Sequence, residues 1–334
     1  MAKQTVTIYD VAREAGVSMA TVSRVVNGNP NVKPSTRKKV SDVIDRLNYR
    51  PNAVARGLAS KKTTTVGVII PDVTNLYFSS LARGIDDIAS MYNYNIILAN
   101  SDGEPTKEIK VLNTILAQQV DGVIFMGHQL SDEVRKEIEL SDTPVVLAGT
   151  VDEANELPSI NIDYRGATKD STQLLIDHGH EKIALLGIDI DSKKQKMTKE
   201  GYKEAIEESD LTYDESLVIR TSPDLNLLDA KELVSHLIEQ GVTAASVEDD
   251  RIAISLLNEL LEQGVKVPED FEIITSNNSP LINISRPKLT TLNQPLYDLG
   301  AVAMRLLTKL MSKEETDELH IVLPYKITEN ETTK

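Results

Sequence analysis

The sequence predicts a small all-helical head followed by a larger α/β body of two doubly wound lobes. Residues 1–62 carry 12 lysines and arginines against 4 acidic residues, a net of +8, whereas the remainder carries 24 against 47, a net of −23 within the total of −15. The head shows helical caps and apolar spacing, and the body alternates short apolar runs with helical stretches. A basic head on an acidic body favours local binding to nucleic-acid phosphates.

The composition excludes several classes of function. The 334 residues include no cysteine, which excludes disulfides, thiol catalysis and cysteine-based zinc sites. An apolar fraction of 40% and a mean hydropathy of −0.22 indicate a soluble globular protein with a sizeable core. No apolar run approaches the roughly 18 residues of a membrane span. The polar N-terminus lacks an apolar signal core, so we expect a cytoplasmic protein.

Three helices are predicted for the head. Thr7 is expected to cap the first, over Ile8–Ala15, and a glycine turn follows it. Ser18 is expected to cap the second, over Met19–Val26. The third runs from Pro34 to about residue 48. This order is typical of a helix-turn-helix module, whose second helix enters the major groove of DNA.

A short fourth helix is predicted after Pro51, over residues 52–58, as a hinge. A helix of this length is marginal by itself. We expect the domains to be the head at residues 1–50, the hinge helix and linker at 51–62, and the body at 63–334.

The body alternates buried strands with helices, as doubly wound α/β units do. Continuous apolar runs predict parallel strands at Val66–Ile70, Asn95–Ala99, Gly122–Met126, Val145–Ala148, Ile183–Leu186, Ala244–Val247 and Phe271–Thr275. Helices are expected at 76–92, 105–118, 132–140, 165–178, 199–208, 227–240 and 250–263, with a further helix that contains Tyr297 and Lys309. Two such lobes imply a cleft between them at the carboxyl ends of the strands.

Two stretches of the head resemble the LacI/GalR family of bacterial repressors, namely Thr7–Gly28 and the hinge Tyr49–Leu58. The resemblance implies that the bases are read by Met19, Ala20 and Arg24. It implies that the phosphates are contacted by Tyr9, Thr21, Ser23 and Asn27. Arg24 can present two donors to guanine, and phosphate contacts fix register. An open alternative for Thr21 and Ser23 is an ordinary exposed helix surface.

For the hinge, the resemblance implies a helix that forms on DNA and pairs with its twin from a second subunit. The minor-groove positions would be Asn52, Ala55 and Leu58, with Leu58 wedged between base pairs. The alternative is that Leu58 is a linker leucine that packs on the body.

The body resembles the periplasmic-binding-protein-like domain of the same family, which usually binds a sugar or purine effector. The sequence departs from the family's pocket at three places. Thr198 stands where an arginine is common, Glu248-Asp249 replaces Asn/Thr-Asp, and Ser276-Asn277 replaces Phe-Asp. A sugar pocket needs matched polar groups for the sugar hydroxyls. These departures argue against a conventional sugar effector.

Three further segments resemble a Gram-positive branch of the family that controls carbon catabolism. They are Arg56–Asp72, Leu81–Ala89 and Gln294–Met311. That branch is activated by the phosphocarrier HPr phosphorylated on a serine. The resemblance implies a docking set of Asp72, Asp87, Tyr297, Asp298, Arg305, Lys309 and Lys326.

The basic pair in this set fits phosphoserine by its spacing. Arg305 and Lys309 are four residues apart on one helix and could clamp a phosphate. The alternative for such a pair is simple solubility. Lys326 replaces the branch's usual arginine, which keeps the charge but loses a two-pronged contact.

Several other patterns are assigned no chemistry. His178-Gly-His180 is interpreted as a turn without a third metal ligand, and Lys193–Lys196 as an exposed loop. The sequence contains no phosphate-loop, nucleophile-elbow or His-Glu-x-x-His motif. We therefore expect no enzyme, no cofactor and no metal site.

The sequence thus predicts a homodimeric, sequence-specific transcription regulator on a pseudo-palindromic DNA operator, with serine-phosphorylated HPr as its corepressor. One alternative keeps DNA binding but has a sugar or sugar phosphate as effector in the cleft. A second is a solute-binding or enzymatic α/β protein with an incidental head.

Overall fold

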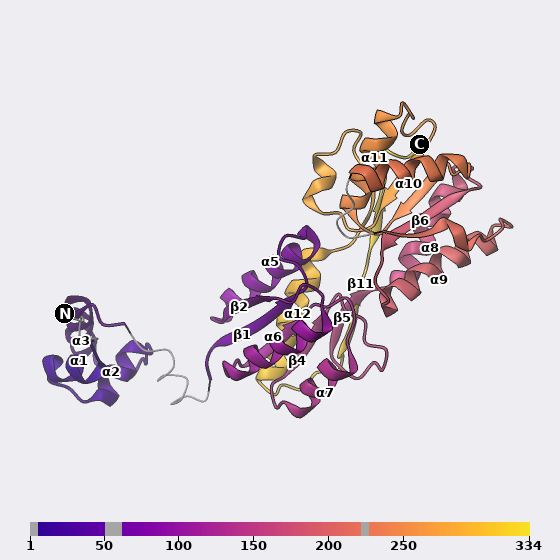
Figure 1. Cartoon of the computed structure of the whole chain (residues 1–334). Coiled ribbons are helices and arrows are strands. Elements are labelled where there is room, and N and C mark those ends of the chain that lie inside the picture. Colours follow the sequence, from indigo (N-terminus) through magenta and orange to yellow (C-terminus); the bar gives the residue numbers. More distant parts are fainter. Residues whose placement is uncertain (1–5, 51–61, 222–226) are drawn as a thin grey trace. The chain divides into compact units, whose positions relative to one another are not determined.

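The computed structural model describes residues 6–50, 62–221 and 227–334 (Figure 1). The chain divides into two compact units, Met1–Thr63 and Thr64–Lys334, called here the head and the body. The predicted hinge positions Asn52, Ala55 and Leu58 lie outside the described residues. No helix among the described residues is long and apolar enough to cross a membrane.

The head contains the three predicted helices, α1 (Ile8–Ala15), α2 (Met19–Val26) and α3 (Pro34–Leu47). The Asp10 carboxylate accepts hydrogen bonds from the Thr7 N–H at 3.0 Å and from its hydroxyl at 2.7 Å, which starts α1. Gly16 ends α1 with a left-handed φ of +57°. The helices pack around a core of Val11, Ala12, Ala15, Val22, Val25, Val40 and Val43.

The body contains two sheets of six strands each. The first lobe has the strand order β11-β5-β4-β3-β1-β2, and all its neighbours are parallel. Its strands are β1 (Thr65–Ile70), β2 (Asn95–Asn100), β3 (Gly122–Phe125), β4 (Val145–Ala148), β5 (Ser159–Ile162) and β11 (His320–Leu323). One face packs on α5 (Leu76–Met91) and α12 (Leu296–Met311), and the other on α6 (Pro105–Ala117) and α7 (Asp132–Leu140).

The second lobe repeats this plan with the strand order β12-β10-β9-β8-β6-β7, in which β12 is antiparallel to β10. Its strands are β6 (Ile183–Ile188), β7 (Val218–Thr221), β8 (Ala244–Val247), β9 (Glu272–Thr275), β10 (Thr290–Asn293) and β12 (Lys326–Thr328). One face packs on α8 (Tyr164–Asp177) and α9 (Lys193–Glu208), and the other on α10 (Leu227–Glu239) and α11 (Asp250–Glu262). The short 3₁₀ helices η1 (Glu215–Leu217) and η2 (Pro280–Asn283) complete the lobe.

The chain passes between the lobes three times, after β5, after β10 and after β11. Consequently α12, which follows β10 of the second lobe, packs in the first lobe beside α5 (Figure 1). The doubly wound, two-lobed body is therefore confirmed.

Two glycines let the backbones of α5 and α12 touch. A Cβ atom on Gly84 would lie 2.1 Å from the Tyr297 carbonyl oxygen, and one on Gly300 would lie 1.9 Å from the Leu81 carbonyl oxygen. Both distances are far inside van der Waals contact, and the blocking atoms are backbone. This contact, called here the glycine contact, fixes which residues of the two helices lie side by side.

One sequence prediction for the body is wrong. The segment Lys193–Lys196 is the first turn of α9 rather than an exposed loop. The Ser192 hydroxyl caps this helix by accepting the Gln195 N–H at 3.2 Å. The sequence prediction also omitted β5, β7, β10, β11 and β12, which are four residues long or shorter.

We predict that Gly84→Ala destabilises the body although alanine is the better helix former. The added methyl forces α5 away from α12, which costs about 1–3 kcal/mol. At about 2–4 °C per kcal/mol for a unit of this size, calorimetry should show a melting temperature several degrees lower. Ser90→Ala, at an exposed position of α5, is the control and should leave it unchanged. An unaltered melting temperature for Gly84→Ala would show that the helices can separate freely.

Candidate DNA interface, docking face and cleft

The three predicted base-reading residues lie on the exposed side of α2. Met19, Ala20 and Arg24 are exposed, whereas Val22 and Val25 anchor the opposite side in the head's core. The Ser18 hydroxyl accepts the Thr21 N–H at 3.2 Å and begins the helix. Among the described residues, the Arg24 guanidinium has no hydrogen bond or ion pair. It is therefore available for the two acceptors of a guanine edge.

The predicted phosphate contacts belong to the same small module. The Tyr9 side chain is 65% exposed at the start of α1, and Asn27 is exposed at the end of α2. Thr21 and Ser23 are half-buried and hydrogen-bond locally: Thr21 Oγ1 lies 2.9 Å from Ser18 Oγ, and Asn27 Nδ2 donates to Ser23 Oγ at 3.4 Å. These hydroxyls can accept or donate one further bond each.

A second set of predicted site residues lies on the surface where α5 and α12 meet. This surface is called here the docking face. Arg83 pairs with Asp87 at 2.9 Å on α5, and the Tyr297 hydroxyl of α12 donates to the Asp87 carboxylate at 3.2 Å. Partial desolvation and this hydrogen bond raise the pKa of Tyr297, while the charges of Arg83 and Arg305 oppose the rise. The glycine contact thus joins an acidic, a basic and a phenolic group from distant parts of the sequence.

The basic pair continues the docking face along α12. Arg305 and Lys309 are exposed and one helical turn apart. Neither side chain forms a hydrogen bond or ion pair with any residue that the structure describes. Two unpaired cations on one turn form a local positive site on an otherwise acidic body.

The remaining predicted docking residues lie in three places. Asp298 is exposed in the first turn of α12, and Lys326 is exposed on β12 directly opposite Asn293. Asp72 instead follows β1 at the mouth of the cleft and lies 3.9 Å from Arg251 of the other lobe. Burial opposes the shift, but hydrogen bonds from Thr74 and the charge of Arg251 lower the pKa of Asp72.

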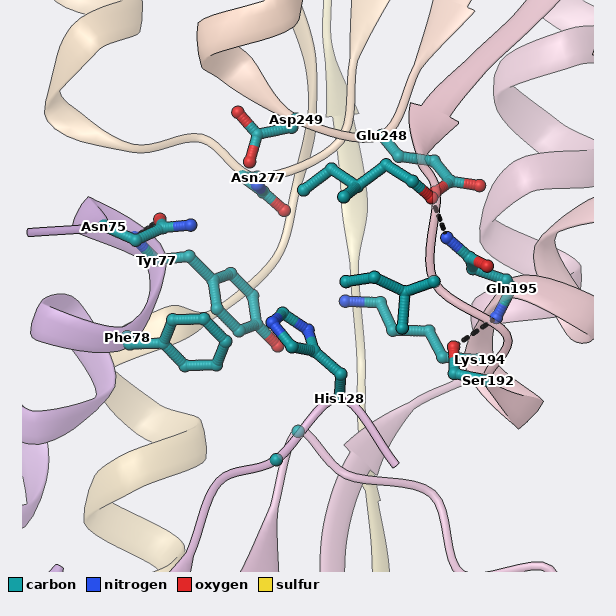
Figure 2. Close-up of a pocket in the computed structure, with 14 residues that line it drawn as sticks. Asn75, Tyr77, Phe78, His128, Ser192, Lys194, Gln195, Glu248, Asp249 and Asn277 are labelled. Atoms are coloured by element: carbon teal, nitrogen blue, oxygen red, sulfur yellow. Dashed lines mark hydrogen bonds between the residues drawn. The ribbon is translucent and has the colours of Figure 1, made fainter. Parts of the chain in front are cut away.

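The cleft between the lobes contains a cavity of about 80 Å³ (Figure 2) and, sharing Asn75, Tyr77, Asp249 and Asn277 with it, a second of about 190 Å³. Ligand pockets for drug-sized molecules have about 300–1,000 Å³. The first cavity is lined from the first lobe by Asn75, Tyr77, Phe78 and His128, and from the second by Lys194, Gln195, Glu248, Asp249 and Asn277. Neither cavity by itself reaches that volume in this arrangement of the lobes.

Lys194 lines the cavity of about 80 Å³, a position that was not predicted from the sequence. Its ammonium lies 4.7 Å from the centroids of both the Tyr77 and the Tyr164 rings. Figure 2 shows the side chain reaching from the second lobe toward Tyr77 and His128. The cap Ser192 was the signal that could have placed Lys194 on a helix rather than in a loop.

At all three places where the sequence departs from the family's effector pattern, the side chains present form bonds within the body. Thr198 donates its hydroxyl to the Lys194 carbonyl at 2.9 Å, and Arg220 pairs with Glu248 at 2.9 Å. Burial raises the pKa of Glu248, although the charge of Arg220 opposes the rise. At the third place, the Gln294 amide donates to Asn277 at 3.3 Å. Each of these side chains thus makes at least one bond within the protein itself.

The His178-Gly-His180 segment forms the predicted turn after α8, with Gly179 at a φ of +90°. His178 Nδ1 lies 2.7 Å from the Glu272 carboxylate, and His180 Nδ1 lies 2.8 Å from the Thr243 hydroxyl. The described part of the chain contains no cluster of three or more side chains able to hold a metal ion.

Comparisons with known proteins match both units. Residues 7–52 match the model for bacterial regulatory proteins of the LacI family, and residues 63–328 match the model for periplasmic binding proteins and the sugar-binding domain of the LacI family. Catabolite control protein A of Streptococcus mutans is 58% identical over 331 residues, which cover 99% of this chain and 98% of that protein.

Two solved structures are also similar to this chain in fold and in sequence. The transcription regulator CcpA of Lactococcus lactis has a TM-score of 0.76 and 48% identity, over 81% of this chain and 99% of that one. The lac repressor dimer bound to operator and the anti-inducer ONPF has a TM-score of 0.87 and 25% identity, over 99% of both chains.

The chain therefore belongs to the LacI family of bacterial regulatory proteins, and it is a DNA-binding transcription regulator rather than an enzyme. Within that family it is a catabolite control regulator, as its full-length similarity shows.

His128 should make the body sensitive to acid. Burial, followed by the charge of Lys194, lowers the pKa of His128 from 6.5 to about 4. As the pH falls below 6.5, the unfolded chain therefore binds a proton that the folded chain refuses, so stability is lost between pH 6.5 and 4. Between pH 7 and pH 5 the loss is about 2 kcal/mol.

The measurement is denaturant unfolding of the wild type and of His128→Gln at both pH values. Because carboxylates titrate in both proteins, the difference between the two losses isolates His128. Equal losses would show that His128 titrates alike in the folded and unfolded chain.

Proposed function

We propose that the chain is a homodimeric regulator that binds a pseudo-palindromic operator when serine-phosphorylated HPr occupies the docking face of the body. The observation that supports the partner best is the exposed, unpaired Arg305 and Lys309 on α12, beside the Tyr297–Asp87 hydrogen bond. A phosphoserine carries about −1.5 to −2 charges at neutral pH and three acceptor oxygens. On one helical turn, the arginine can donate two parallel hydrogen bonds to the phosphate and the lysine can contact it with a compact positive charge.

The rest of the docking face suits a protein better than a small molecule. Asp87 and Asp298 can face basic residues around a phosphoserine, and the half-exposed Tyr297 ring supplies apolar area. Asp72 and Lys326 would extend the contact toward the cleft and the second lobe, and at Asp72 a partner's cation would compete with Arg251.

For DNA binding, we propose a division into a helix-turn-helix domain at residues 1–50, a hinge helix and linker at 51–62 and a regulatory domain at 63–334. Met19, Ala20 and Arg24 would read bases, and phosphates would be held by Tyr9, Thr21, Ser23 and Asn27. In the hinge, Asn52, Ala55 and Leu58 would enter the minor groove. The partner-bound body would favour the state in which two hinges pair, because a ligand shifts an equilibrium toward the state that it binds better.

Exposed apolar residues support the homodimer. Met91, Tyr92, Ile97 and Leu98 are 72%, 49%, 37% and 41% exposed at the end of α5 and on β2, the edge strand of the first sheet. A hollow of about 450 Å³ between β2 and α6 adjoins them. Exposed apolar edges are usually covered in the working protein. The lac repressor, of the same fold, is a dimer on its operator.

The second candidate is a sugar or sugar phosphate as effector in the cleft. It is favoured by the match to a sugar-binding domain model. The modest volumes of the two interlobe cavities, about 80 and about 190 Å³, and the bonds that Thr198, Glu248 and Asn277 make within the body argue against it.

We predict that Arg305→Ala with Lys309→Ala abolishes the response to the partner. In the wild type, serine-phosphorylated HPr should raise operator affinity about five- to 150-fold, which corresponds to a coupling free energy of about 1–3 kcal/mol between the two sites. In the double variant the gain should vanish, while partner-free affinity stays the same. Fluorescence anisotropy of a labelled operator at fixed salt measures both.

The control is Lys136→Ala with Lys231→Ala, which removes the same charge from exposed positions on α7 and α10. Unphosphorylated HPr, glucose and ribose complete the experiment. A response to a sugar but not to phosphorylated HPr would establish the second candidate. Loss of partner-free binding in the double variant would instead indicate misfolding.

Arg24→Ala should remove sequence discrimination rather than attraction to DNA. The lost guanine contact lowers operator affinity by about 1–3 kcal/mol, or roughly five- to 150-fold, with little change on random-sequence duplex. Lys38→Ala, an exposed cation on α3, should instead weaken both complexes alike. Competition binding on the two duplexes measures the ratio. An equal loss on both for Arg24→Ala would mean that Arg24 contacts phosphate.

A further inference from the structure

Lys194 is the most unusual side chain in the cleft. It starts from α9 of the second lobe, and its ammonium lies 4.7 Å from the ring centroid of Tyr77 on α5 of the first lobe. It lies at the same distance from the ring of Tyr164, the first residue of α8, where the chain has just crossed between the lobes. Both rings are at least 95% buried, and Lys194 is itself half-buried, so the cation–π contacts are partly shielded from water.

The position of Lys194 in its helix is unfavourable. Lys193, Lys194 and Lys196 occupy the first turn of α9, which contains no acidic residue. Cations at a helix N-terminus are repelled by the helix dipole. A residue that is unfavourable in its own helix is expected to make a compensating interaction elsewhere in the fold. For Lys194, the two tyrosine rings supply that compensation.

The other charged contacts between the lobes are weaker. Arg251 and Asp72 lie 3.9 Å apart, with side chains 33% and 39% exposed. Lys196 and Glu153 also lie 3.9 Å apart, with side chains 55% and 65% exposed. Exposed pairs at such distances contribute little. The contact of Lys194 with Tyr77 is the better shielded link.

The cavity beside Lys194 is too small for a sugar-sized ligand while the lysine stays in place. The side chain extends through the cleft toward Tyr77 and His128 (Figure 2). The lobes therefore meet around a cation that belongs to the protein itself.

We propose that Lys194 is an interlobe latch, a built-in occupant of the cleft that holds the two lobes closed without a small molecule. Opening the cleft requires the ammonium to leave the Tyr77 ring of the first lobe, and a molecule that enters the cavity beside Tyr77 and His128 must displace it. The latch depends on the body alone and does not rest on the proposed protein partner.

Distances between spin labels on the two lobes test the latch directly. The chain has no cysteine, so Lys136→Cys on α7 and Glu200→Cys on α9 give two unique, exposed label sites. Labelled protein is diluted with excess unlabelled protein so that pairs within one chain dominate. We expect one narrow distance population for the wild-type background, without any added sugar.

Lys194→Met keeps the apolar stem and removes the charge. We expect the population of longer distances to rise about two- to thirtyfold, the range that corresponds to a cation–π contact. Lys194→Arg keeps a cation over the rings and should restore the narrow distribution. Lys193→Met removes the same charge from the same turn and should leave the distribution unchanged. If Lys194→Met matches the wild type, or if Lys193→Met opens the cleft equally, there is no latch.

Discussion

The glycine contact between α5 and α12 is the constraint on which the rest of the body depends. At Gly84 and Gly300 the backbones of the two helices touch. A side chain at either position would clash with the facing backbone and displace a helix. Residues more than 200 positions apart in the sequence, such as Asp87 and Tyr297, consequently share a hydrogen bond. The docking face exists because the chain returns to the first lobe after building most of the second.

The same helix, α5, connects the docking face with the cleft. Tyr77 lies in its first turn, under the Lys194 ammonium, and Asp87 lies near its last turn, bonded to Tyr297. A partner that shifts α5 against α12 would therefore also change the contact that closes the lobes. Coupling of this kind requires an element with two discrete arrangements. The close packing at Gly84 and Gly300 makes a gradual shift of α5 along α12 unfavourable, which favours two distinct positions of the helix.

The head, the alternating strands and helices and the two-lobed class followed from the sequence, because caps such as Thr7 and continuous apolar runs such as β1 are local signals. Short strands such as β7, with sequence Val-Ile-Arg-Thr, carry too few residues to show a period. The start of α9 was missed because its first turn is basic. Of the site, Arg24 and the Arg305–Lys309 pair were predicted from the family resemblance, and the helical spacing of the pair is compatible with a phosphate. The meeting of Lys194 with Tyr77 and of Asp72 with Arg251 requires the folded chain.

We propose that this body recognises a phosphoserine presented by a protein. Isothermal titration of the full-length chain with HPr, in the absence of DNA, measures that recognition by itself. We expect one phosphorylated HPr bound per chain and binding at least about tenfold weaker without the phosphate, since charge-assisted contacts are worth about 1.5–3 kcal/mol. Equal affinity for the two forms, or no binding of either, would contradict it.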